Sequence, residues 1–117
     1  MVAAERLRRN YKLLKLLKKS KKVQRRKLLE TANKDLILCL CDCANNILKG
    51  NVNLKPKETH RLKRHKATLR TLATSSKNVN KKRKLLIQKG GFLPMLLAPI
   101  LSVAGGLVSK LISGNRE

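Results

Sequence analysis

The stretch RRKLLETANKDLILCLCDCANNIL, residues 25–48, decides the fold class of this chain. Five apolar residues recur in it at i, i+3, i+4, i+7 and i+11, the spacing of one helical face. They are Leu36, Cys39, Leu40, Cys43 and Ile47. The segment GNVNLKP then ends the pattern, because Gly50 follows the last periodic residue and Pro56 cannot continue a helix. The sequence therefore predicts one helix over residues 25–48.

A helix is predicted on each side of this segment. Residues 3–19 form a basic amphipathic pattern whose inner face carries Leu7, Tyr11, Leu14 and Leu17. Beyond the stop, Pro56 suits the first turn of a helix, and Glu58 is favourable near its N-terminus. The apolar face of that helix carries Leu62, His65, Leu69 and Leu72.

The last part of the chain changes from basic to apolar. A short helix is predicted from Lys81 to the pair Gly90-Gly91, and an apolar run follows. The chain shows no strand-like alternation, so we expect an all-α fold. Its expected form is a small basic helical hairpin or loose bundle with a C-terminal apolar helical tail, partly disordered when free.

Charge is distributed unevenly between these parts. The 117 residues include 29 Lys and Arg and 6 Asp and Glu, a net charge of +23. Residues 1–91 hold 27 of the cations and 5 of the acids, a net of +22, whereas the last 26 residues hold +1. We divide the chain into a basic amphipathic N-terminal arm (1–24), a helical hairpin (25–74), a basic linker ending in Gly-Gly (75–91) and an apolar C-terminal tail (92–117).

So high a charge opposes compaction by self-repulsion, and a polyanion relieves it. Basic side chains lie along successive phosphates and release counterions. No zinc finger, helix-turn-helix spacing or heptad repeat accompanies them, so we expect sequence-independent binding of double-stranded DNA, with RNA as an alternative. The candidate nucleic-acid-binding residues are Arg6, Arg8, Arg9, Lys12, Lys15, Lys18, Lys19, Lys21, Lys22, Arg25, Arg26, Lys27, Arg61, Lys63, Arg64, Lys66, Arg70, Lys81, Lys82, Arg83 and Lys84.

Other features narrow the class of protein. Only Tyr11 and Phe92 are aromatic, which argues against recognition of single strands by stacking. KKSKKVQRRK at 18–27 and KKRK at 81–84 are similar to nuclear localisation signals. The N-terminus has no secretory pattern, and three cysteines within five residues are not a disulfide framework. A reducing intracellular compartment is expected.

Metal binding and catalysis have little support in the sequence. Cys39 and Cys43 share a helical face, whereas Cys41 points away from it, so CLCDC suggests helix-interface packing rather than a zinc site. For Cys41, the roles of a free reactive thiol and of an intermolecular link stay open. The acids stand singly among cations, and neither His60 nor His65 accompanies a nucleophile motif. We expect no enzyme, catalytic residue, metal, cofactor or small-molecule substrate.

The apolar tail leaves several interpretations open. Residues 92–112 are long enough to span a bilayer, and cations precede them as in a membrane anchor. A membrane-active helix, an assembly tail that contacts a capsid protein, and a buried helix are the alternatives. A membrane-associated protein is therefore the second function to test beside nucleic-acid binding.

The junction between the two parts resembles the C-terminal half of the precursor of adenovirus core protein X, also called mu. Similar proteins occur in polinton- and adintovirus-type elements. The resemblance covers about 25 residues: Lys89, Gly90, Gly91, Phe92, Leu93, Pro94, Leu96, Leu97, Pro99, Ile100 and Leu101, then Val103, Ala104 and Gly105-Gly106.

The resemblance implies a virion core protein that condenses packaged double-stranded DNA, located in the virion core and the host nucleus. In that family the viral cysteine protease cuts after Gly-Gly and releases the apolar tail. The candidate processing site here is therefore Gly90, Gly91 and Phe92. Gln88 stands where the protease of the family prefers an aliphatic residue.

Overall fold

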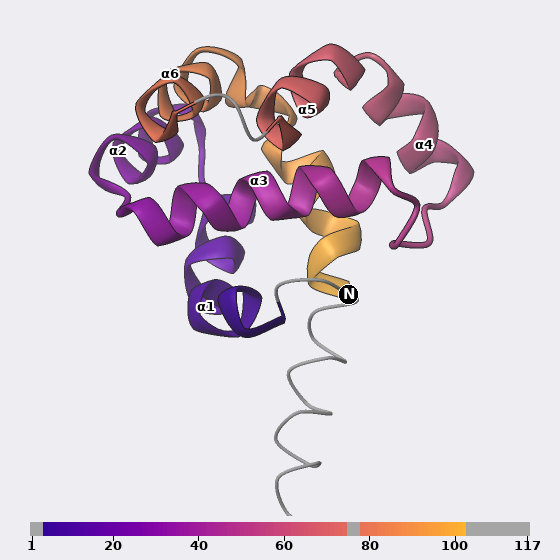
Figure 1. Cartoon of the computed structure of the whole chain (residues 1–117), viewed down its shortest axis with the longest axis horizontal. Helices are drawn as coiled ribbons and strands as arrows, with labels where there is room; N and C mark the ends of the chain where they lie inside the picture. Colours follow the sequence, from indigo (N-terminus) through magenta and orange to yellow (C-terminus); the bar gives the residue numbers. More distant parts are fainter. Residues whose placement is uncertain (1–3, 75–77, 103–117) are drawn as a thin grey trace, which may run out of the picture.

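The computed structural model describes residues 4–74 and 78–102 (Figure 1). Helices make up 84% of these residues and none of them is in a strand, which confirms the all-α prediction. The elements are α1 (Ala4–Lys19), α2 (Lys22–Thr31), α3 (Lys34–Leu48), α4 (Pro56–Lys63), α5 (Lys66–Ala73), α6 (Val79–Lys89) and the 3-10 turn η1 (Gly90–Phe92). Residues 93–102, here called the apolar helix, follow η1 directly.

The prediction of one helix over residues 25–48 is wrong, because the chain breaks between α2 and α3. Ala32 is extended, with ψ 137°, and Asn33 caps α3. The Asn33 side chain accepts a hydrogen bond from the Leu36 backbone N–H at 2.9 Å. A side-chain oxygen at this position satisfies an N–H that has no partner within the helix, so a new helix begins here.

The predicted helix beginning at Pro56 is also divided, into α4 and α5 around Arg64 and His65. Its N-terminus forms as expected: Pro56 is the first residue of α4, and Glu58 Oε1 accepts a hydrogen bond from the Lys55 backbone N–H at 2.8 Å. Gly50, at the stop after α3, has a φ of +73°, a left-handed conformation that glycine adopts without steric cost.

Helix α3 is the centre of the fold, and α1, α5 and α6 pack against it (Figure 1). The predicted stripe on α3 is buried along its whole length. Ile37 and Cys41, which point away from that stripe, are 0% and 6% exposed. A helix buried on more than one face needs apolar residues all round, which explains the unbroken run from Leu36 to Cys41.

The apolar helix contributes much of the core and crosses the far side of α3 in Figure 1. Phe92, Leu93, Leu96, Leu97 and Ile100 are each 0% exposed, and they share one core with residues of α1, α3 and α5. The sequence division places a boundary after residue 91, whereas this core contains residues from both sides of it. Residues 75–77 of the predicted linker and 103–117 of the predicted tail lie outside the described residues.

The helical run Val79–Ser102 is, by length and composition alone, long and apolar enough to cross a membrane. Half of its most apolar 18-residue window is buried inside the fold. Among the alternatives given for the apolar tail, the buried helix is therefore the one that the described residues 93–101 form.

Candidate nucleic-acid interface

Most of the candidate nucleic-acid-binding residues are exposed. Of the 21 cations, 17 are exposed, in or directly beside α1, α2, α4, α5 and α6. Arg6, Arg25 and Arg83 are half-buried, and Lys82 is buried at 6% exposure. The local sequence pattern does not predict the burial of these four side chains.

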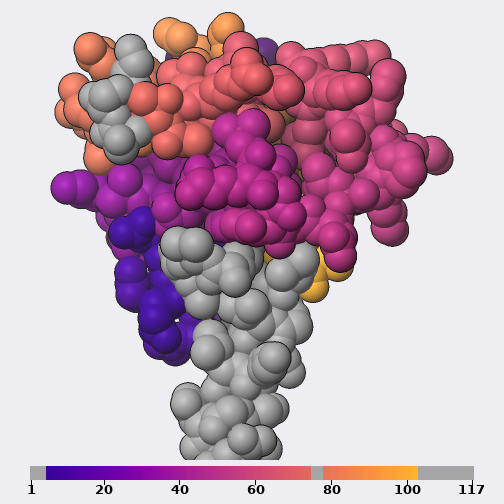
Figure 2. Space-filling model, turned by 45° about the vertical axis from the view of Figure 1, so that its right-hand side comes forward, coloured from indigo at the N-terminus to yellow at the C-terminus, as the bar shows by residue number. Residues whose placement is uncertain are grey.

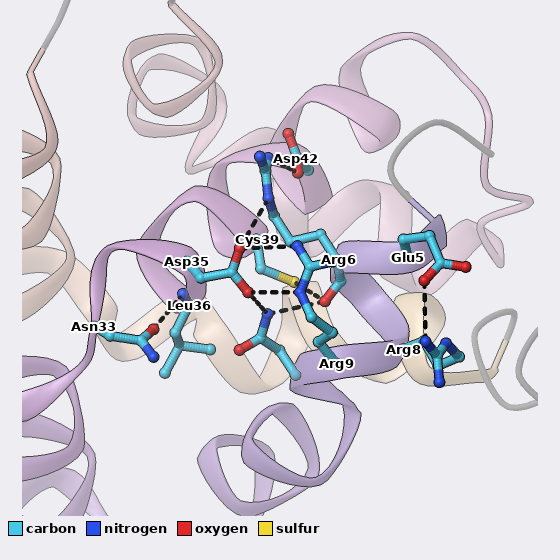
Figure 3. Close-up of polar contacts among 10 residues, drawn as sticks. Glu5, Arg6, Arg8, Arg9, Asn33, Asp35, Leu36, Cys39 and Asp42 are labelled. Atoms are coloured by element: carbon cyan, nitrogen blue, oxygen red, sulfur yellow. Dashed lines mark hydrogen bonds and ion pairs between the residues drawn. The ribbon is translucent and has the colours of Figure 1, made fainter.

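Arg6 and Arg9 of α1 bind acids of α3 (Figure 3). Arg6 Nη1 donates to Asp42 Oδ2 at 2.6 Å, and Arg6 Nε lies 3.4 Å from Asp35 Oδ1. Arg9 Nη2 and Nε donate to the two carboxylate oxygens of Asp35 at 3.1 and 3.3 Å, a two-pronged contact. Asn10 Nδ2 adds a hydrogen bond to Asp35 at 2.9 Å. These two arginines dock α1 on α3 and are less free than the lysines to bind a polyanion.

The network keeps Asp35 ionised. Hydrogen bonds from Arg9 and Asn10 lower the pKa of Asp35 to about 2, against the ordinary value of 3.8. The hydrogen bond to Asp42 raises the pKa of Arg6. The α1–α3 contact is thus held by charge at neutral pH, and its partners lie 26 to 36 positions apart in the chain.

The remaining described acids also have local partners. Glu5 pairs with Arg8 at 3.0 Å and Glu30 with Arg26 at 3.1 Å, and Glu58 caps α4. Every ion pair among the described residues uses an arginine. The exposed lysines of residues 4–74 and 78–102 consequently form no ion pair with a described acid, which is the state in which a phosphate backbone can bind them.

The fold brings two basic segments together that are distant in sequence. Helix α2 and helix α6 pack side by side (Figure 1), so that Arg83 lies at the C-terminal end of α2 and Gly90 lies beside Arg25. Arg83 connects the two helices: its Nη1 donates to the carbonyl oxygens of Leu29 at 2.7 Å and Ala32 at 2.6 Å. It thereby satisfies carbonyls at the C-terminal end of α2, which have no partner within the helix.

The cations of α4 and α5 lie elsewhere. Arg61, Lys63, Arg64, Lys66 and Arg70 are all exposed. Figures 1 and 2 place α4 at the opposite end of the molecule from α2. The predicted interface is therefore not one patch, because basic surfaces lie at both ends of the fold.

The candidate processing site lies in folded structure. Gly90 and Phe92 are buried in the turn η1, and Gly91 is exposed. The rings of His65 and Phe92 are stacked, with their centroids 5.3 Å apart. A protease needs an accessible extended segment, so cleavage between Gly91 and Phe92 requires this turn to open.

All three cysteines are free and buried. Burial raises the pKa of Cys41 to about 11, and the hydrogen bond with Cys39 together with burial raises that of Cys43 well above its ordinary value. The interpretation of Cys39 and Cys43 as interface-filling side chains is confirmed by their 0% exposure. The suggestion that Cys41 is an accessible thiol is wrong, because α3 is covered on that side too. In the described part of the chain no cluster of three or more His, Cys, Asp or Glu could hold a metal ion.

No family model, curated protein or solved structure matches this chain. The resemblance to the adenovirus core protein therefore depends on the residues near Gly90-Gly91 alone.

The contacts that distinguish structural arginines from free cations could not be predicted from the local sequence pattern. The partners of Arg6, Arg9 and Arg83 lie 26 to 54 positions away, beyond any helical periodicity. Asn33 did carry a signal, since an asparagine three residues before a periodic leucine is a typical N-cap.

Proposed function

We propose that this protein binds double-stranded DNA without sequence preference and compacts it by neutralising phosphates. The observation that carries this proposal is the set of exposed lysines that form no ion pair within the described structure. Five described acids are held by arginines or by a helix N-terminus, so they do not offset the lysines.

The placement of the cations supports compaction rather than simple coating. One basic surface belongs to α2 and α6, and another belongs to α4 at the opposite end, with the exposed cations of α5 between them (Figure 1). A small protein that is basic at both ends can contact two duplex segments at once and lower the repulsion between them. On the resemblance given above, we place this activity in a virion core and the host nucleus, for a virus or mobile element of adenovirus type.

A salt series tests the proposal. Affinity for a short duplex should fall steeply with salt, with a slope near −9 if about ten phosphates are neutralised. Replacing Lys12, Lys18, Lys19 and Lys27 with Ala should weaken binding to all duplex sequences alike and flatten the slope by up to about 3.6.

The matched control replaces the same four lysines with Arg, which keeps every charge and should leave the slope unchanged. Equal affinities of wild type and the alanine variant would contradict the proposal. Tighter binding of structured RNA than of duplex DNA at the same salt would favour the RNA alternative instead.

A membrane surface is the second candidate, favoured by one observation on α1. Leu13 and Leu16 are 39% and 47% exposed. Each directly follows an exposed lysine in the chain, Lys12 and Lys15 respectively. An apolar pair among lysines is typical of helices that lie on anionic lipid. Association with liposomes that persists at high salt would support this candidate, since apolar burial is not screened.

A further inference from the structure

A cavity of about 330 Å³ lies between α2 and the diglycine turn. Lys22, Arg25 and Arg26 of α2 form its basic wall, and Gln88, Gly90 and Gly91 form the opposite wall. Every lining residue belongs to the described part of the chain. The cavity is thus a basic concave site built from residues 22–29 and 87–91, two segments that the fold brings together.

Arg25 is the residue of this cavity that is best placed to bind an anion. It is half-buried, and a Cβ built on Gly90 would lie 3.7 Å from Arg25 Nε, so the turn passes close to the guanidinium. Its neighbour Arg26 has a carboxylate partner, Glu30 at 3.1 Å, but Arg25 has none within ion-pair distance among the described residues. A partly desolvated cation without an acid favours an external anion.

The walls of the cavity are held in place. Arg83 ties α6 to the last carbonyls of α2 through hydrogen bonds of 2.6 and 2.7 Å. Leu29 is buried beneath the turn, and its Cδ1 would lie 3.6 Å from a Cβ on Gly90. An anion site with fixed walls requires little ordering when it is filled, which favours binding.

We propose that this cavity holds one phosphate group of a nucleic-acid backbone and so fixes where the duplex crosses α2. The inference rests on the proposed function and adds a defined contact to it. A guanidinium presents a planar fork of donors that matches two phosphate oxygens, and Lys22 adds a point charge beside it. Inorganic phosphate shares this chemistry, so the test must separate the two sources.

Gly91 offers a test that leaves Arg25 intact. Gly91 is exposed, and nothing lies within 4 Å of a Cβ built on it, so a side chain fits there. Gly91→Asp places a carboxylate at the cavity and should lower duplex affinity at least about tenfold at 0.15 M salt. Gly91→Ala controls for the side chain, and Asn33→Asp, which keeps a capping oxygen at the N-terminus of α3, controls for the added charge. Both controls should change affinity less than about threefold.

A second pair of variants removes charge instead. Arg25→Gln should reduce duplex affinity several-fold more than Arg61→Gln, which removes one exposed cation of α4. Circular dichroism of each variant checks that the fold is kept. Equal losses for the two arginines, and for Gly91→Asp and Asn33→Asp, would overturn the cavity site while leaving diffuse DNA binding intact. Absence of salt-dependent duplex binding by the wild type would overturn the proposed function, and the cavity site with it.

Backbone amide shifts of the full chain distinguish the two phosphate sources. A short duplex should shift the amides of Gln88, Gly90 and Gly91 at micromolar concentration, whereas inorganic phosphate should require millimolar concentration. Saturation by inorganic phosphate at micromolar concentration would overturn the assignment to a nucleic-acid backbone.

Discussion

The imidazole ring of His65 stacks on the phenyl ring of Phe92, with ring centroids 5.3 Å apart and an interplanar angle of 26°. This contact joins the start of α5 to the residue that follows the diglycine. It holds the Gly91–Phe92 bond inside a folded turn, and Phe92 itself is 0% exposed. The state of folding therefore controls access to the candidate processing site.

We predict that a protease specific for Gly-Gly cuts the folded chain slowly at this bond. A peptide covering residues 84–98 has no fold to open, so it should be cut at least about tenfold faster. His65→Ala, which removes the stacked ring, should raise the rate for the full chain. Mass spectrometry of the products over time measures both rates, and equal rates for peptide and folded chain would contradict the prediction. Resistance of the peptide itself would mean that Gln88 prevents recognition.

The apolar helix should be essential for stability. Leu96 is 0% exposed, and Leu96→Ala should lower the free energy of unfolding by about 2–5 kcal/mol. Leu16 on α1 is 47% exposed, and the same change there should cost no more than about 0.5 kcal/mol. Urea unfolding followed by circular dichroism gives both values. A chain ending at Gly91 loses Phe92, Leu93, Leu96, Leu97 and Ile100 together, so it should lack most of the helical signal.

A chain ending at Gly91 and the full chain therefore differ in fold as well as in length. Unequal DNA affinities of the two could come from unfolding of the basic part and need no tail contact with DNA. The DNA affinity of Leu96→Ala, compared with that of the wild type, shows how much a weakened core alone lowers binding, because this variant keeps every residue of the tail.

The sequence predicted α1 and the stripe on α3 well because each buries a face with a regular helical spacing. It missed the extra burial of α3, although six consecutive apolar residues from Leu36 to Cys41 were a signal that more than one face is covered. Periodicity identifies the face a helix buries against one neighbour. It does not show how many neighbours the helix has.

The candidate interface was less predictable than the fold. Charge density correctly indicated a strongly basic surface, because most lysines have no structural partner and stay exposed. It could not separate Arg6 and Arg83 from these lysines, because their partners Asp42 and Leu29 lie 36 and 54 positions away. A count of cations treats structural and free cations alike, and only tertiary contacts distinguish them.

Arg83 should matter more for the fold than its neighbour Lys84. Arg83→Gln removes two hydrogen bonds from a charged donor to the end of α2, so we expect the free energy of unfolding to fall by about 1.5–3 kcal/mol. Lys84 is exposed, and Lys84→Gln should be nearly neutral. Chemical denaturation compares the two variants, which lose the same charge. Equal stabilities would show that the cap of α2 contributes little.

The α1–α3 contact should be sensitive to acid. The pKa of Asp35 is lowered to about 2 in the folded chain, below its ordinary value of 3.8. A lowered carboxyl pKa contributes stability that is complete above about pH 4 and is lost as pH falls through about 2. Asp35→Asn should therefore lower Tm by several degrees at pH 7 and by much less near pH 2.

Glu30 provides the control for this experiment. It pairs with Arg26 on the exposed surface of α2, so Glu30→Gln should change Tm little at either pH. Thermal unfolding of the wild type and both variants from pH 2 to pH 7 measures the difference. A loss of Tm in Asp35→Asn that is the same at pH 2 and pH 7 would show that the effect comes from packing rather than from charge.

The three cysteines should be unreactive while the chain is folded. Cys39 and Cys43 are 0% exposed, Cys41 is 6% exposed, and the pKa of Cys41 is raised to about 11. The thiolate is the reactive form, so at pH 7.5 both burial and the raised pKa slow alkylation. Iodoacetamide should label the chain at least about a hundredfold faster in 6 M guanidinium chloride than in buffer, as mass spectrometry counts the added groups. Rapid labelling of one cysteine in buffer would show that α3 is uncovered in solution, and Cys41→Ser would then identify whether that side of the helix opens.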